Sequence, residues 1–340
     1  MALLTTSSDI PWELQGWYDR TLLERARPAL LFDMFGQTRP LPKNQGKRIN
    51  FRRYGKLAVN TTPLTDGVTP TGKKLSTTDI YSPIYFYGDY VILTDQLIMT
   101  GLDKNIMDIC ENVLSEQAAE SKDTIARDHL VTGTSVRYAN NVSARTSIVT
   151  AMSDGDVEVV INELKRNDAR RLRDINTAGR GVGTSPINAS YIAITHPDNE
   201  HAVRSLTGFV PVQEYPNRDS LSKSAGEVVE IGAAHDCRFL MTSMAKIWAD
   251  GGGTAVTNNL RYTTANTACD VYGTLFFAKN AYGIIPLQKE TISTIVQKLG
   301  SEGSADPLNQ RSSVGYKFAN AVKITNEDWI WRIEHGCVSL

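Results

Sequence analysis

Two runs of strand-forming residues in the first third of the chain predict a long hairpin. Residues 48–52 alternate between apolar and polar at a period of two, which is the pattern of a half-buried strand. Residues 81–93 are rich in tyrosine, valine and isoleucine, which favour strands. Between them, residues 60–74 contain two prolines and two glycines and are expected to form a loop. A hairpin over residues 47–94 cannot bury so wide a polar tip itself, so the tip must lie in solvent or on a partner.

Helical periodicity follows the hairpin in two places. A long helix is predicted over residues 103–132, with Asp103 as its N-cap, and it would span about 45 Å at 1.5 Å per residue. That length exceeds a small domain, so the helix is expected to act as a spine. A shorter helix follows Ser153, which begins an S-x-x-D capping pattern with Asp156. Apolar residues from Val157 onward then recur at helical spacing.

Shorter strands are predicted in the rest of the chain. Residues 191–195 have the pattern of a buried strand, and residues 226–231 that of an extended segment. Residues 237–285 are rich in strand-forming residues on both sides of a glycine loop. In the tail, apolar residues at a period of two over residues 314–324 are expected to share one face, and residues 329–333 form a final strand.

The N-terminal residues 1–46 have the character of an arm rather than of a domain. They carry Trp17 and Tyr18, and a helix is expected over residues 21–35 with an interruption at Pro28, whose ring disfavours a helix interior. So apolar a segment must pack either on the body of its own chain or on a neighbouring subunit. Composition favours neither alternative.

Composition excludes several classes of protein. The chain has 340 residues, for which roughly two domains are expected. Its 36 Lys and Arg against 37 Asp and Glu give a net charge of −1, which excludes a strongly basic nucleic-acid binder and an acidic tail protein. Its four cysteines lack CxxC spacing, so neither a zinc ribbon nor a disulfide framework is indicated, and a reducing compartment is favoured. We expect no signal peptide and no membrane-spanning segment.

One segment contains residue types that bind metals. His196, Asp198, Glu200 and His201 lie close together, and imidazole and carboxylate ligands suit zinc, manganese or iron. The spacing is not HExxH, and Pro197 favours instead the start of a helix whose N-terminus attracts the two acidic side chains. This segment nevertheless supports one alternative function, a soluble metal-dependent enzyme.

Other candidate motifs are weaker. His235, Asp236 and Cys237 are adjacent, and neighbouring residues on a strand point to opposite faces, which disfavours a Cys/His dyad there. Glycines at residues 179–183 and 251–253 lack the context of a nucleotide-binding loop. The basic run over residues 43–53 is typical of a solvated strand face, with nonspecific phosphate contact as the alternative. We therefore expect no catalytic residues, no metal ligands and no cofactor.

Several segments resemble the major capsid proteins of tailed bacteriophages, specifically the branch named after coliphage N-four. They are residues 17–44, 47–75, 88–95, 116–134 and 298–334. The strongest piece runs from Gly300 to Lys317, where an ADPLNQR run is followed by Val-Gly-aromatic-Lys. Tyr316 stands where the family would be expected to have tryptophan, which is a conservative departure.

The resemblance implies an α+β fold, the Hong Kong 97-like phage capsid fold. The expected parts are an N-terminal arm (1–46), an extended E-loop β-hairpin (47–94), a peripheral (P) domain with the long spine helix (95–149), mainly the axial (A) domain (150–285) and a C-terminal return to the P domain (286–340).

The resemblance also implies a function in assembly rather than catalysis. The chain would be the major capsid protein of a tailed double-stranded DNA bacteriophage or prophage, forming hexamers and pentamers of an icosahedral shell. Its partners would be other copies of itself, packaged double-stranded DNA held by nonspecific contacts, and scaffolding, portal and decoration proteins, but no membrane. The protein would be found in the virion capsid, and in the host cytoplasm before assembly. An encapsulin-like nanocompartment shell protein is the closest alternative.

Two groups of residues are the expected sites. The residues expected to contact another subunit are Trp17, Tyr18, Leu22, Thr65, Asp66, Gly67, Lys73 and Lys74. A second group is expected to organise the turn before the tail strand through Asx-type hydrogen bonds, namely Asp306, Asn309 and Arg311.

Overall fold

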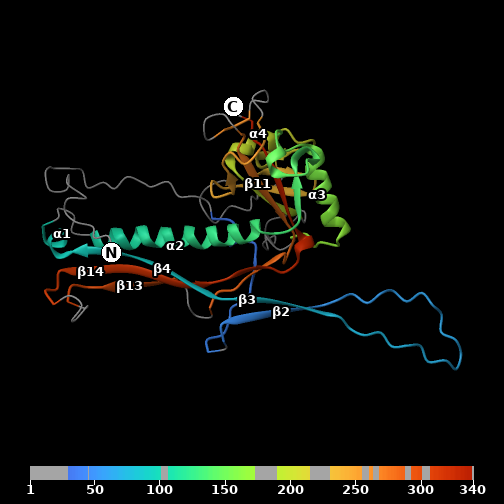
Figure 1. Cartoon of the computed structure of the whole chain (residues 1–340), viewed down its shortest axis with the longest axis horizontal. Coiled ribbons are helices and arrows are strands. Elements are labelled where there is room, and N and C mark those ends of the chain that lie inside the picture. Colours follow the sequence, from blue (N-terminus) through green and yellow to red (C-terminus); the bar gives the residue numbers. More distant parts are fainter. Residues whose placement is uncertain are drawn as a thin grey trace, which may run out of the picture.

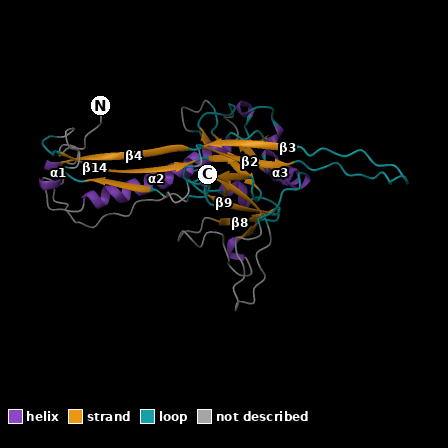
Figure 2. Ribbon diagram, turned by 90° about the horizontal axis from the view of Figure 1, so that it is seen from below, coloured by secondary structure: helices purple, strands orange, loops and turns teal. Residues whose placement is uncertain are grey.

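The computed structural model combines a long helix-on-sheet layer, a lobe built on a larger sheet, and a loop that extends away from both (Figures 1 and 2). It describes residues 30–44, 46–100, 106–172, 190–214, 230–254, 260–262, 268–287, 292–300 and 307–338. No helix within these ranges is long and apolar enough to cross a membrane.

The long layer is built on the helix that the sequence predicts as a spine. This helix, α2 (Ile106–Val131), has 26 residues and follows the short α1 (Asp95–Thr100). Its sheet partner is antiparallel and has the order β13 (Ser293–Gln297), β14 (Arg311–Asn320) and β4 (Tyr85–Thr94). Leu114 and Ala118 of α2 pack with Val314, Tyr316 and Phe318 of β14 in one buried cluster. Burial of this apolar stripe therefore fixes the helix along one face of the sheet.

The predicted hairpin is divided between two sheets. β2 (Arg48–Tyr54) pairs with β3 (Thr77–Pro83), whereas β4 pairs along its whole length with β14. The single return strand over residues 81–93 is therefore wrong, because the chain changes partners at Ile84. The Ile84 side chain enters a separate apolar cluster and its N–H donates to the carbonyl of Lys47. Periodicity could not show this change, because strand-forming residues continue across it.

The larger sheet forms the core of the lobe. Its strands are ordered β5 (Val136–Tyr138), β16 (Ile330–His335), β11 (Val271–Phe277), β6 (Tyr191–Thr195), β9 (Cys237–Met241), β8 (Glu230–Ala234) and β7 (Val210–Pro211), and β10 (Ile247–Trp248) also pairs with β11. Every residue of β6 and β11 is buried. This confirms the strands predicted over residues 191–195 and 237–285. Of the extended segment predicted over residues 226–231, residues 230 and 231 belong to β8, and the others lie outside the described residues.

Helices and a small sheet complete the lobe. A three-stranded sheet contains β1 (Gln37–Thr38), β12 (Tyr282–Ile284) and β15 (Val322–Ile324). The helices are α3 (Asp154–Arg166) and α4 (Glu200–Arg204), and the 3-10 helices are Ala139–Asn141, Arg145–Ser147, Pro197–Asn199, Val212–Glu214 and Glu327–Trp329.

Helix α3 confirms the capping prediction. The Ser153 hydroxyl accepts the Asp156 N–H at 3.3 Å, and the Asp156 carboxylate accepts the Ser153 N–H at 3.4 Å. Val157, Val160 and Leu164 are fully buried against the large sheet. Cap and apolar stripe agree on the same element, which is why the sequence predicted it.

The tail differs from its prediction. The apolar residues over 314–324 do not share one face, because β14 ends at Asn320 and β15 begins at Val322 in a different sheet. The final strand is confirmed as β16, which joins the large sheet beside β11. The segment 286–340 is therefore shared between the long layer and the lobe.

The end of the N-terminal segment is also described. Residues 32–36 form a turn followed by a bend, so the predicted helix does not continue to residue 35. Phe32 is buried, and its carbonyl accepts the Tyr282 hydroxyl at 2.7 Å. Asp33 donates its N–H to the buried carboxylate of Asp123 on α2 at 3.0 Å. These bonds attach the segment to its own chain at this point.

Candidate assembly surfaces

The loop between β2 and β3 is the most exposed part of the described chain. Every residue from 56 to 76 is exposed, and the loop points away from the long layer (Figure 1). Its two arms are joined at the base, where Gly55 donates its N–H to the Ser76 carbonyl at 2.8 Å. Further out, the Lys73 ammonium donates to the Ala58 carbonyl at 2.7 Å.

The tip contains three of the predicted contact residues. Val68 N–H donates to the Thr65 carbonyl at 3.2 Å, which closes a turn through Asp66 and Gly67. Gly67 has φ of +74°, a conformation that glycine adopts without steric cost. Lys74 lies on the returning arm. Contact of these residues with another subunit stays a prediction, and Trp17, Tyr18 and Leu22 lie outside the described residues.

Apolar side chains on the loop are unusually exposed. Val59 is 80% exposed and Leu64 is 74% exposed, and Leu57, Val68 and Leu75 are also exposed. Scattered apolar residues are common on surfaces, but this group lies on one projecting element. Covering it would release a substantial apolar area from water.

A second apolar surface lies on the face of the long sheet opposite α2. It is an open groove of about 440 Å³, with Phe86, Tyr90 and Ile295 among its lining residues. Its floor is formed at Gly88 and Gly315. A side chain at Gly315 would come within 2.7 Å of Cβ of Tyr90, so that position has no room for one.

The groove and the loop lie on different parts of the subunit. β4 runs from the middle of the molecule toward α1, whereas the loop leaves β2 and β3 in the other direction (Figures 1 and 2). In this structure the loop therefore does not cover the groove of its own chain.

The predicted turn residues are only partly described. Asn309 has φ of +57°, a left-handed conformation that asparagine tolerates well and that suits a turn. Arg311 begins β14 opposite Thr94. Asp306 lies outside the described residues, so the Asx-type hydrogen bonds stay a prediction.

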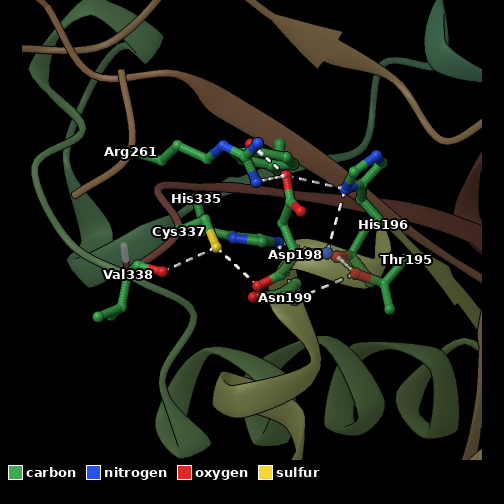
Figure 3. A network of polar contacts seen from close by, with 10 residues as sticks. Thr195, His196, Asp198, Asn199, Arg261, His335, Cys337 and Val338 are labelled. Carbon is green, nitrogen blue, oxygen red and sulfur yellow. Dashed lines mark hydrogen bonds and ion pairs between the residues drawn. The ribbon is translucent and has the colours of Figure 1, made fainter. Parts of the chain in front are cut away.

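The segment from His196 to His201, considered above as a possible metal site, uses its polar side chains for contacts within the protein (Figure 3). His196 Nδ1 accepts the Asp198 N–H at 3.2 Å and thereby caps the 3-10 helix. The Asp198 carboxylate binds Arg261 at 2.5 Å and accepts the Tyr272 hydroxyl at 2.8 Å. The Glu200 side chain contacts Arg204 within α4 instead. Three of the four candidate donors, His196, Asp198 and Glu200, therefore have partners within the protein, which disfavours the metal cluster considered as an alternative for this segment.

Glu200 and His201 belong to α4, the short helix that continues from the 3-10 helix Pro197–Asn199. Glu200 binds Arg204 one turn further along α4 at 2.7 Å. His201 is exposed. The alternative prediction, that Pro197 starts a helix, is confirmed.

The segment around residue 236 forms a turn rather than a strand. His235 and Asp236 both have positive φ, 49° and 66°, and Ala234 pairs with Cys237 across them. This is the two-residue hairpin expected of such a conformation. The three residues therefore do not lie along one strand, because Cys237 begins β9 after the turn. His235 Nε2 donates to Asp154 of α3 at 2.6 Å.

The cysteines are not activated nucleophiles. Burial raises the pKa of all four thiols, and that of Cys337 rises to about 11. Thiolate is the reactive form of cysteine, so these side chains behave as packing groups.

Comparisons with solved structures identify the fold. The capsid of Ralstonia phage GP4 aligns with a TM-score of 0.65 at 12% identity, covering 99% of this chain and 98% of the other. The acid-stable capsid of Helicobacter pylori bacteriophage KHP30 aligns at 0.61 with 11% identity and 99% coverage of both chains. The capsid of cyanophage P-SCSP1u aligns at 0.59 with 14% identity, covering 94% and 92%. The chain therefore has the Hong Kong 97-like phage capsid fold, as the resemblance implied. No protein-family model and no curated protein matches the chain.

Proposed function

We propose that this chain, with its Hong Kong 97-like fold, is the major capsid protein of a tailed double-stranded DNA bacteriophage or prophage. The observation that carries the proposal is the exposed loop over residues 56–76, on a fold shared with phage capsids along nearly its whole length. A monomeric protein has no use for an apolar loop that its own body cannot cover. A shell subunit needs such an element to overlap its neighbour.

Assembly follows from the placement of the two apolar surfaces. The loop of one copy lies over the open groove of the next, which is a heterologous contact that closes into rings of five or six when the rotation fits. Each contact is modest, so a misplaced subunit can dissociate. Many contacts together stabilise the shell through multivalency.

The proposal assigns the regions of the capsid fold to particular elements. In this proposal β2, β3 and their loop form the E-loop, α2 with its sheet forms the P domain, and the large sheet forms most of the A domain. The N-terminal arm is residues 1–46, as the resemblance implies. A net charge of −1 allows the shell to hold DNA by nonspecific contacts without binding it tightly. Portal, scaffolding and decoration proteins would complete the virion, which assembles in the host cytoplasm.

Deleting residues 60–74 tests the proposal. We expect a subunit with unchanged circular dichroism and unfolding midpoint, because the deleted residues are exposed, but no shells by light scattering and negative-stain microscopy. A matched control replaces the same residues with an equally long Gly-Ser sequence, which restores loop length without its side chains. Normal shells from the deletion variant would overturn the role of the loop.

A further inference from the structure

Four buried polar side chains form a chain of hydrogen bonds beneath Asp198 (Figure 3). They come from β6, the 3-10 helix after it, β11 and β16, and each is completely buried. Asn199 Nδ2 lies 3.1 Å from Thr195 Oγ1, which lies 2.9 Å from Thr274 Oγ1. Thr274 Oγ1 lies 2.8 Å from His335 Nε2. These four residues are called the relay below.

The direction of the hydrogen bonds is fixed at one end. His335 Nδ1 lies 2.8 Å from the carbonyl oxygen of Gly336, which can only accept, so Nδ1 carries a proton. In the neutral ring, Nε2 must then accept from Thr274. Thr274 in turn accepts from Thr195, and Thr195 accepts from the amide of Asn199. Every donor in the relay therefore points toward His335.

This arrangement leaves one acceptor without a donor. Asn199 Oδ1 is buried and has no hydrogen-bond partner, while Asn199 Nδ2 also lies 3.4 Å from His335 Nε2. A buried polar atom without a partner is costly. A proton on Nε2 would be donated to Thr274 and would reverse the two hydroxyl groups, and a half-turn of the Asn199 amide would place Oδ1 where Thr195 then donates.

We propose that the relay is a proton-operated switch with two hydrogen-bonded states. One proton from solvent binds the lone pair of His335 Nε2, the hydroxyl groups of Thr274 and Thr195 reverse, and the Asn199 amide rotates. No covalent bond changes. The rotation disturbs the turn after β6, to which Cys337 is attached through its thiol donating to the Asp198 carbonyl at 2.8 Å.

The charges around the ring are already neutralised by partners. Asp156 of α3 and Glu334 of β16 favour a charged His335. Asp156 binds Arg137 at 3.2 Å, and Glu334 binds Arg145 at 2.6 Å. The other titratable or charged groups nearby are Tyr272 of β11, whose ring stacks 6.4 Å from that of His335, and Arg332, Asp198, Arg261 and Cys337.

Burial decides when the proton binds. It lowers the pKa of His335 to about 4, against about 6.5 in the unfolded chain. The unfolded chain therefore takes up the proton first, and folding stability falls as the pH drops below about 6.5, until the folded form is also protonated near pH 4. Between pH 7 and pH 5 this favours unfolding by a factor of about 20.

Denaturant unfolding of the full chain at pH 7 and pH 5 tests the inference. His335→Gln should remove this factor of about 20, because glutamine does not titrate there. His201→Gln, which changes an exposed histidine of α4, is the matched control and should keep it. Equal pH dependence in wild type and His335→Gln would overturn the proposal.

A second measurement needs no core deletion. Nitrogen NMR of the imidazole at pH 7 should find the proton of His335 on Nδ1, and a proton on Nε2 instead would overturn the relay. Asn199→Asp supplies a carboxylate next to Nε2 and should raise the titration midpoint of His335 by about one pH unit or more. An unchanged midpoint would show that Asn199 only fills space. Neither readout requires a shell, so the inference can fail independently of the proposed function.

Discussion

At the scale of single residues, Asp123 shows why a buried charge was missed. Its carboxylate is 1% exposed and faces the backbone N–H groups of residues 31–33, which lie about ninety positions away in the sequence. Its position in α2 gave no sign of that contact. The capping role of Ser153 was predictable, because its partner Asp156 is only three residues away. Local chemistry could be derived from the sequence, and long-range polar contacts could not.

The pKa of Asp123 gives a prediction with the opposite sign to that of His335. Burial raises it to about 6, so the folded form holds a proton that the unfolded form has lost. This contribution to stability is complete below about pH 3.8 and is lost as the pH rises through 6. Asp123→Asn should therefore remove about 2–3 kcal/mol of pH dependence between pH 4 and pH 8. Urea unfolding at both pH values measures it.

The control for Asp123→Asn is Asp108→Asn, an exposed carboxylate on the same helix. It should leave the wild-type pH dependence in place. If Asp123→Asn behaved in the same way, the raised pKa would have no effect on folding.

At the scale of elements, agreement depended on how many signals coincided. α3 has a capping box and a buried apolar stripe, and β6 is a short apolar run, so both were predicted within a residue or two. The division between β3 and β4 was not predicted, because it is set by pairing partners far along the chain. The prediction that residues 314–324 share one face was wrong for the same reason, because the chain passes from β14 to a different sheet at Ala321.

The cap of α3 supports a prediction at this scale. Ser153→Ala removes the hydroxyl that accepts the Asp156 N–H, and should lower the free energy of unfolding by about 1 kcal/mol. Ser115→Ala on the exposed face of α2 is the control, and should change it by less than about 0.5 kcal/mol. Thermal unfolding of both variants distinguishes them. Equal effects would show that the Ser153 cap does not stabilise α3.

At the scale of the whole molecule, the fold was predicted from the resemblance to capsid proteins, and the residue patterns predicted some of its elements. A wide loop between strands and a spine helix were both predictable from patterns. Their opposite directions in space were not, because no local pattern reports where a loop points. The groove on the long sheet was also missed, since Gly88 and Gly315 become neighbours only through pairing of β4 with β14.

The groove gives the last prediction. Ile295→Lys places a charge on a side chain that is 49% exposed, so subunit stability should change by less than about 0.5 kcal/mol. Shell yield, counted by negative-stain microscopy, should fall at least tenfold, because the neighbour's apolar loop would have to bury that charge. Val159→Lys on α3, 39% exposed, should assemble normally. Equal yields from the two variants would remove the groove from the contact.

The exposed loop also makes the isolated chain susceptible to proteolysis. Lys56, Lys73 and Lys74 stand on extended backbone in open solvent, which is where trypsin-like proteases cut most readily. If the chain assembles as proposed, a subunit that waits unassembled would be cleaved most often, and cleavage there would remove the element that joins it to a neighbour. Incorporation into a shell would shield these bonds. The pool of assembled protein would thus be enriched in chains that found partners quickly, and degradation would act as quality control before packaging.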